Sequence, residues 1–177
     1  MKKLLLVVLT LLAVEGIAQT TTKAPDAPGL EFVCELNVLV EKPMIVGETA
    51  HGTRRVIPIG GGTFEGPNMK GEIVKGGADW QIVRKDGVAE LEAHYTIKTD
   101  DGVFIYVKNK GLRVASPEVA ACIGRGEAVS PSEYYFRAVP QFEAPAGSKY
   151  EWLNNAIFIC RGIRNPNSVV IQVYKVQ

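Results

Sequence analysis

The chain has 177 residues, an almost balanced charge and few cysteines, and these totals exclude several classes of protein. Its formal net charge is +1 and no basic run is longer than Arg54-Arg55, so neither nucleic acid nor an anionic membrane surface is expected as a partner. Cys34, Cys122 and Cys160 form no Cys-x-x-Cys pair and only two histidines are present, so no metal site is indicated.

The first 18 residues have the three parts of a signal peptide in order. Lys2 and Lys3 precede an apolar run, residues 4–14, and Gly16-Ile17-Ala18 places small residues before the expected cleavage point. The run is shorter than the ~20 residues of a membrane span, so we expect the processed chain to carry no membrane anchor. A buried N-terminal strand or helix is the alternative. The sequence therefore predicts export to the periplasm or secretion, a flexible leader over residues 19–29, and one domain over residues 30–177.

Short segments of period-two alternation follow, which is typical of half-buried strands. The predicted strands cover residues 32–40, 54–59, 69–74, 80–83, 88–98, 103–109, 134–142, 156–161 and 169–176. Asp86-Gly87 and Asp101-Gly102 are turn pairs that join neighbouring segments into hairpins. This spacing, without a βαβ rhythm, predicts an all-β fold. A closed antiparallel β-barrel is expected, with a sandwich as the main alternative, and periodicity alone does not separate the two.

One short helix is predicted after residue 116. Ser116 is a good N-cap, Pro117 suits the first helical position and Glu118 favours the positive end of the helix dipole. Residues 119–123 supply an apolar side, and Gly124 or Gly126 ends the helix. We expect this helix to pack on the barrel as a lid or plug.

Glycines gather at residues 60–66, but no Gly-Lys-Ser/Thr follows, so a bulge or tight bend is favoured over a phosphate loop. The segment 88–98 leaves two readings open. If its apolar side faces the barrel interior, Glu92 and His94 face solvent; if the barrel holds a polar pocket, Glu92 points inward and needs a partner. The candidate partners are Arg54, Arg113 and Arg137.

The run of residues 51–59, the glycine bend at 60–66 and Gly76-Gly77-Ala78-Asp79-Trp80-Gln81 together resemble the family called domain of unknown function 3237. Matches continue through Tyr95-Thr96, Gly111-Leu112-Arg113 and the stretches 133–137 and 152–154, so the resemblance covers about residues 30–176. It implies a closed, lipocalin-like antiparallel β-barrel. It implies no settled activity and no established catalytic residues, and the signal peptide and the cysteines lie outside the shared pattern.

An eight-stranded barrel can hold one small ligand, and ligand sites combine aromatic walls with a few polar groups. The candidate ligand-binding residues are Arg54, Asp79, Trp80, Glu92, Tyr95, Tyr106, Tyr135, Arg137 and Trp152. Three functions compete: a barrel that binds a small organic molecule, an isomerase, cyclase or lyase that needs no cofactor and uses a pocket carboxylate or tyrosine, and a structural module with a filled barrel. The oligomeric state stays open.

Two specific contacts are also predicted. Arg137 lies mid-strand among aromatic residues, so we expect it to face the interior and pair with Asp79 or Glu92. Cys34 and Cys160 lie in a first and a late strand, which often meet when a barrel closes, so a disulfide between them is expected if their Cα atoms come within ~7 Å.

Overall fold

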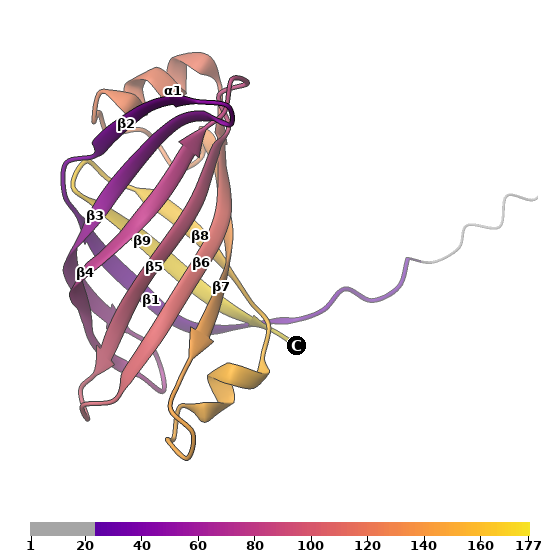
Figure 1. Ribbon diagram of the computed structural model, residues 1–177. Coiled ribbons are helices and arrows are strands. Elements are labelled where there is room, and N and C mark those ends of the chain that lie inside the picture. The colour runs from indigo at the N-terminus through magenta and orange to yellow at the C-terminus, as the bar shows by residue number, and fades with distance from the viewer. Residues whose placement is uncertain (1–23) are drawn as a thin grey trace, which may run out of the picture.

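The computed structural model describes residues 24–177, and these form an antiparallel barrel that encloses one core (Figure 1). Every pairing in its sheet is antiparallel. The strands are β1 (Leu30–Val40), β2 (Met44–Thr49), β3 (Gly52–Glu65), β4 (Lys70–Val83), β5 (Ala89–Thr99), β6 (Phe104–Ala115), β7 (Tyr134–Glu143), β8 (Phe158–Arg164) and β9 (Ser168–Val176).

Closure of the barrel comes from the first strand. β1 pairs with β9 along one edge and with the second half of β3 along the other, so eight strands, β1 and β3 to β9, complete the wall. β2 pairs only with the first half of β3 and lies outside this closed ring. The predicted closed barrel, which the family resemblance implies and strand spacing left open against a sandwich, is confirmed, and the sandwich is excluded.

The predicted helix is α1 (Pro117–Gly124), and it lies at the same end of the barrel as β2 (Figure 1). Ser116 caps it, because its Oγ accepts a hydrogen bond of 3.3 Å from the backbone N–H of Val119. A 3₁₀ helix, η1 (Glu151–Asn155), lies near the opposite end (Figure 1). Both predicted Asp-Gly turns are present, with positive φ at Gly87 and Gly102.

The half of the interior nearer η1 is filled with apolar side chains. Ile97 and Ile105 are 0% exposed, and Leu153 of η1 is 1% exposed. The rings of Phe142 and Phe158 meet edge to face with centroids 5.0 Å apart, a favourable geometry for aromatic pairs. Dense packing here leaves the other half of the barrel to hold any cavity.

The strand pattern differs from the sequence-based expectation in two places. β2 was not predicted, because its residues are mostly exposed on both faces and so show no alternation. The two expected strands 69–74 and 80–83 are one strand, β4, whose register with β5 shifts between Val74 and Ala78. A second shift, between Pro58 and Gly62, confirms the bulge predicted in the glycine run, although β3 continues through it.

The predicted disulfide is wrong: Cys34, Cys122 and Cys160 are free. Cys34 of β1 and Cys160 of β8 are both paired with Val173 of β9, so one whole strand separates them. The predicted signal peptide and the first part of the leader, residues 1–23, lie outside the described residues. Within residues 24–177, no helix is both long and apolar enough to cross a membrane.

Candidate functional site

A cavity of about 480 Å³ occupies the half of the barrel nearer α1. The inner faces of the strands form its walls, and residues 41–43, 165–167 and the C-terminal end of α1 surround its mouth. Aliphatic side chains such as Ile57, Ile59 and Leu91 line much of it. A concave, largely apolar space of this size with a few polar groups is the usual form of a small-molecule site.

Asp79 of β4 is the carboxylate on the inner wall of this cavity, and both of its oxygens are engaged. Its Oδ2 accepts a hydrogen bond of 2.5 Å from Nε2 of Gln81, and its Oδ1 accepts one of 3.0 Å from the backbone N–H of Glu92. The Oε1 atom of Gln81 accepts a bond of 2.9 Å from Nε of Arg55. A chain of hydrogen bonds therefore joins Arg55, Gln81 and Asp79 along the wall.

Burial has the largest effect on the pKa of Asp79. Loss of solvent raises the pKa of its carboxyl above the ordinary value of 3.8, against the opposing effects of the Gln81 and Glu92 donors and of Arg113 and Arg55. Burial also lowers the pKa of Arg55, which Asp79 partly restores. A carboxyl with a raised pKa beside an apolar cavity is suited to giving and taking a proton.

The deeper wall combines an aromatic ring with small residues. Tyr95 is 4% exposed, and burial raises the pKa of its phenol. The Phe136 ring packs against Gly162, where a Cβ atom would come within 2.4 Å of the ring. Glycine at 162 thus lets Phe136 lie across the interior, where it forms part of the cavity wall.

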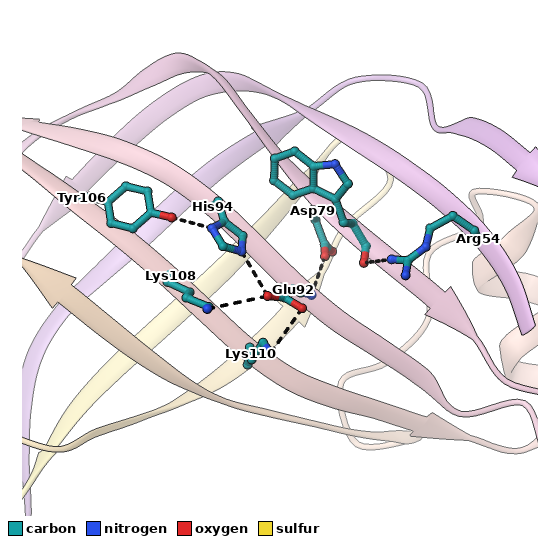
Figure 2. A network of polar contacts seen from close by, with 8 residues as sticks. Arg54, Asp79, Glu92, His94, Tyr106, Lys108 and Lys110 are labelled. Atoms are coloured by element: carbon teal, nitrogen blue, oxygen red, sulfur yellow. Dashed lines mark hydrogen bonds and ion pairs between the residues drawn. The ribbon is translucent and has the colours of Figure 1, made fainter. Parts of the chain in front are cut away.

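Of the residues proposed from the sequence, Arg54, Trp80, Glu92 and Tyr106 lie on the outer wall. Figure 2 shows Glu92 and Tyr106 joined through His94, while Arg54 donates separately to the backbone carbonyl of Trp80. Glu92 contacts Lys110 at 3.3 Å and Lys108 at 3.8 Å. His94 lies between Glu92, 3.2 Å from its Nε2, and the Tyr106 hydroxyl at its Nδ1. The reading that places Glu92 and His94 on the solvent side of the strand is therefore the one observed.

The last three proposed residues also lie away from the cavity. Tyr135 and Arg137 are exposed on β7, and the Arg137 guanidinium stacks over the Tyr135 ring at 5.3 Å. The expectation that Arg137 faces the interior is wrong, because β7 alternates strictly and its inward positions are taken by Phe136 and Ala138. Trp152 is on η1, where its ring lies 6.0 Å from that of Phe158.

Asp79 and Tyr95 are the proposed residues that do line the cavity, and the structure adds polar neighbours that the sequence reasoning missed. These are Arg55, Gln81, Asn109 and Arg164. Arg113, which the sequence offered only as a candidate partner for Glu92, lines the cavity with them. A signal for some of them was present: Asn109 and Arg113 continue the period-two series of Ile105 and Val107. A polar residue in phase with a buried apolar series marks a position that faces the interior.

Residues 24–177 contain no group of three or more His, Cys, Asp or Glu side chains placed to hold a metal ion. The chemistry available within the described cavity is that of carboxyl, amide, ammonium and guanidinium groups and one phenol. These groups bind and orient polar atoms of a ligand and exchange protons with it.

The sequence matches the family described as "Protein of unknown function (DUF3237)" over residues 28–176. Two curated relatives carry the name UPF0311 protein. The one from Clostridium acetobutylicum is 42% identical over 147 residues, covering 82% of this chain and 92% of the relative. The one from Rhodopseudomonas palustris is 42% identical over 151 residues, covering 84% of this chain and 98% of the relative.

Solved structures of similar proteins have the same barrel fold. A crystal structure of a protein of unknown function from Rhodopseudomonas palustris superposes with a TM-score of 0.82 at 35% identity, covering 87% of this chain and all of that one. A more distant relative, the hydroalkoxylation enzyme phnH of Penicillium herquei, is 28% identical over 131 residues, covering 74% of this chain and 72% of the relative. A structure of an enzyme from the same fungus has a TM-score of 0.65 at 22% identity, covers 88% of this chain and 99% of that one, and shares the fold.

Proposed function

The chain belongs to the DUF3237 family, and from that premise we propose that it binds a small organic molecule in the barrel cavity. The observation that carries the proposal is the cavity of about 480 Å³ with the bonded chain of Arg55, Gln81 and Asp79 on its wall. Its apolar lining accepts the body of an organic molecule, and its polar groups fix the orientation. A purely structural barrel has no need to keep a buried carboxyl facing open space, because burying it costs free energy.

Export would place this binding in the periplasm or outside the cell. That part of the proposal rests on the N-terminal sequence, and the amino terminus of the protein made in a bacterium is its test. Processing after Ala18 gives Gln19 as the first residue. An intact Met1 on soluble cytoplasmic protein would contradict it.

A fluorescence titration with N-phenyl-1-naphthylamine, a neutral probe that brightens in apolar sites, tests the binding. Ala93 lines the cavity, so we expect Ala93→Phe to fill space there and weaken probe binding about tenfold or more. Thr96, on the same strand, is paired with Tyr106 and lies on the opposite face. Thr96→Phe is the matched control and keeps the affinity of the unaltered protein. Equal binding by all three proteins would overturn the proposal.

A second candidate function is acid–base catalysis by Asp79 without a cofactor. The raised pKa of its carboxyl favours it, and the name of the Penicillium herquei relative suggests the reaction class, addition of an O–H group across a carbon–carbon double bond. In such a step the Asp79 carboxyl gives its proton to one alkene carbon while the hydroxyl oxygen bonds to the other. The hydroxyl proton then returns to Asp79, so atoms and charge balance.

Turnover of 2-allylphenol in D₂O tests this candidate, because addition leaves one deuterium on carbon in the cyclic product. We expect Asp79→Asn to abolish deuterium incorporation while N-phenyl-1-naphthylamine still binds. Glu92→Gln, on the outer wall, is the control that leaves incorporation unchanged. Incorporation that persists in Asp79→Asn, or that is absent from the unaltered protein, would contradict the candidate.

A further inference from the structure

The charged groups around the cavity are unequally divided between the two signs. Its lining contains two acidic residues, Asp79 and Glu41, and five basic residues, Lys42, Arg55, Arg113, Arg125 and Arg164. Glu41 is already paired with Lys75 at 2.9 Å, and Arg125 with Glu127 at 2.6 Å. Asp79 is then the remaining carboxylate of the lining against four basic side chains. The acidic groups therefore leave positive charge on the wall uncompensated.

Of the four arginines that line the described cavity, Arg113 is the one whose guanidinium lacks a protein acceptor. Arg55 donates to Gln81, Arg164 to the carbonyl of Glu127, and Arg125 to the carboxylate of Glu127. Within residues 24–177, no oxygen accepts a hydrogen bond from the Arg113 side chain, and no carboxylate forms an ion pair with it.

The position of Arg113 shows where its donors point. Among the described residues, no buried side-chain nitrogen or oxygen lacks a hydrogen-bond partner. Because Arg113 has no such partner, its guanidinium nitrogens must border open space rather than packed protein. That space is the cavity which Arg113 lines, since its backbone continues the inward-facing series of β6.

Its electrostatic surroundings agree with this geometry. Burial, followed by the repulsion of Arg55 and Arg164, lowers the pKa of Arg113 to about 10, and Asp79 and Tyr134 offset this only in part. Like charges gathered in a space of low polarity are costly unless an anion joins them. An oxyanion placed against Arg113 would remove that cost.

We infer that the cavity takes a small organic anion whose carboxylate, enolate or phenolate oxygen is held by the unpaired guanidinium of Arg113, beside Arg55 and Arg164. This inference rests on the proposed function and adds the chemical class of the ligand. The planar fork of an arginine matches an oxyanion with two parallel N–H donors. The apolar side chains around Ile57 and Leu91 then contact the carbon body of the ligand.

Two related fluorescent probes test the inference. 8-Anilinonaphthalene-1-sulfonate carries an anionic group on the same ring system that N-phenyl-1-naphthylamine presents without charge. We expect the sulfonate to bind one per chain and more tightly than the neutral probe. In Arg113→Met its dissociation constant should rise about tenfold or more, the usual effect of losing a hydrogen bond to a charged group, while the neutral probe binds as before.

Arg137→Met is the matched control, since Arg137 lies on the adjacent strand but on the outer wall. It should bind both probes as the unaltered protein does, and Arg113→Lys should recover part of the lost affinity because it keeps the charge without the fork. Circular dichroism and the thermal midpoint report whether each variant is folded. If Arg113→Met does not fold, Arg113→Lys against Arg137→Lys provides the same comparison.

The outcomes separate the two proposals. If sulfonate binding is unchanged in folded Arg113→Met while Ala93→Phe still weakens binding of the neutral probe, the anion inference is overturned and small-molecule binding stands. Where Arg113→Met does not fold, full affinity in Arg113→Lys overturns it, because loss of the fork should weaken binding. Failure of Ala93→Phe to affect either probe would overturn the proposed function itself. Loss of sulfonate binding in Arg137→Met as well would also contradict the inference, because it would assign the anion to the outer surface.

Discussion

The inner and outer walls of β4 and β5 each carry a carboxylate, and the two behave in opposite ways. Asp79 faces the cavity and Glu92 faces outward, yet the backbone N–H of Glu92 donates to Asp79 over 3.0 Å (Figure 2). Burial raises the pKa of Asp79 despite its donors. Burial would also raise the pKa of Glu92, but His94, Lys110 and Lys108 more than offset it and lower that pKa.

The contrast shows that the protonation of a carboxyl group in this barrel depends on the side of the wall it occupies and not on the residue type. On the outer wall water and nearby cations keep Glu92 ionised, and such exposed ion pairs contribute little to stability. On the inner wall the same functional group keeps its proton more readily and borders space that a ligand can enter. Substitutions at matched inner and outer positions can test how general this difference is.

The largest expected difference between the walls is in thiol reactivity. Burial raises the pKa of Cys34 to about 12 and that of Cys160 to about 11, which suppresses the reactive thiolate. Cys122 on α1 is accessible, although a hydrogen bond with Glu127 raises its pKa. With Ellman's reagent, one thiol of the native protein should react at least about a hundredfold faster than the other two.

Cys122→Ser should remove the fast reaction. In denaturant without a reductant, all three thiols of the unaltered protein should react. Two fast thiols in the native protein would contradict the inward placement of Cys34 or Cys160. A count of one thiol in denaturant would restore the disulfide that the structure excludes.

A smaller effect separates two adjacent residues of β6. Ile105 is 0% exposed, so Ile105→Ala should lower the free energy of unfolding by about 2–5 kcal/mol through lost burial and the cavity it leaves. Phe104 is 55% exposed with Lys98 over its ring, and Phe104→Ala should cost less than about 1 kcal/mol. Urea unfolding followed by circular dichroism measures both, and equal costs would refute the assigned faces of β6.

The smallest expected effect concerns how the free energy of unfolding depends on pH, because Asp79 and Glu92 contribute slopes of opposite sign. Asp79 binds its proton more tightly in the folded chain than in the unfolded one, so its contribution to stability falls as pH rises from about 3.8 through the raised pKa. Glu92 has a lowered pKa in the folded chain, so its contribution is present above about 4.5 and is lost as pH falls. Each slope is limited to about 1.4 kcal/mol per pH unit for one proton.

Unfolding free energies measured from pH 3 to 7 for Asp79→Asn and Glu92→Gln check these signs. Relative to Asp79→Asn, the unaltered protein should become less stable as pH rises; relative to Glu92→Gln, it should become more stable over the acidic part of the range. Slopes of the same sign would show that the two walls do not differ in the way the structure implies.

The sequence by itself determined the local features of this protein. Alternation along residues 88–98 separated Leu91 and Tyr95 from Glu92 and His94, and Ser116 with Pro117 located the helix. These features follow from the two-residue period of a strand and from the needs of a helix terminus, which neighbouring residues along the chain satisfy. The family pattern added the closed barrel.

Only the tertiary structure decided which polar residues share the interior. Arg54 and Arg55 are neighbours on one strand, yet Arg54 donates to a backbone carbonyl on the outer wall and Arg55 lines the cavity. The bulges in β3 and β4 change the phase of alternation, so counting from the sequence does not carry across them. The space around Asp79 and Arg113 exists because β1 closes on β3 and β9 while apolar side chains fill the other half of the barrel. Such a cavity depends on contacts between strands far apart in the chain, which local sequence patterns do not encode.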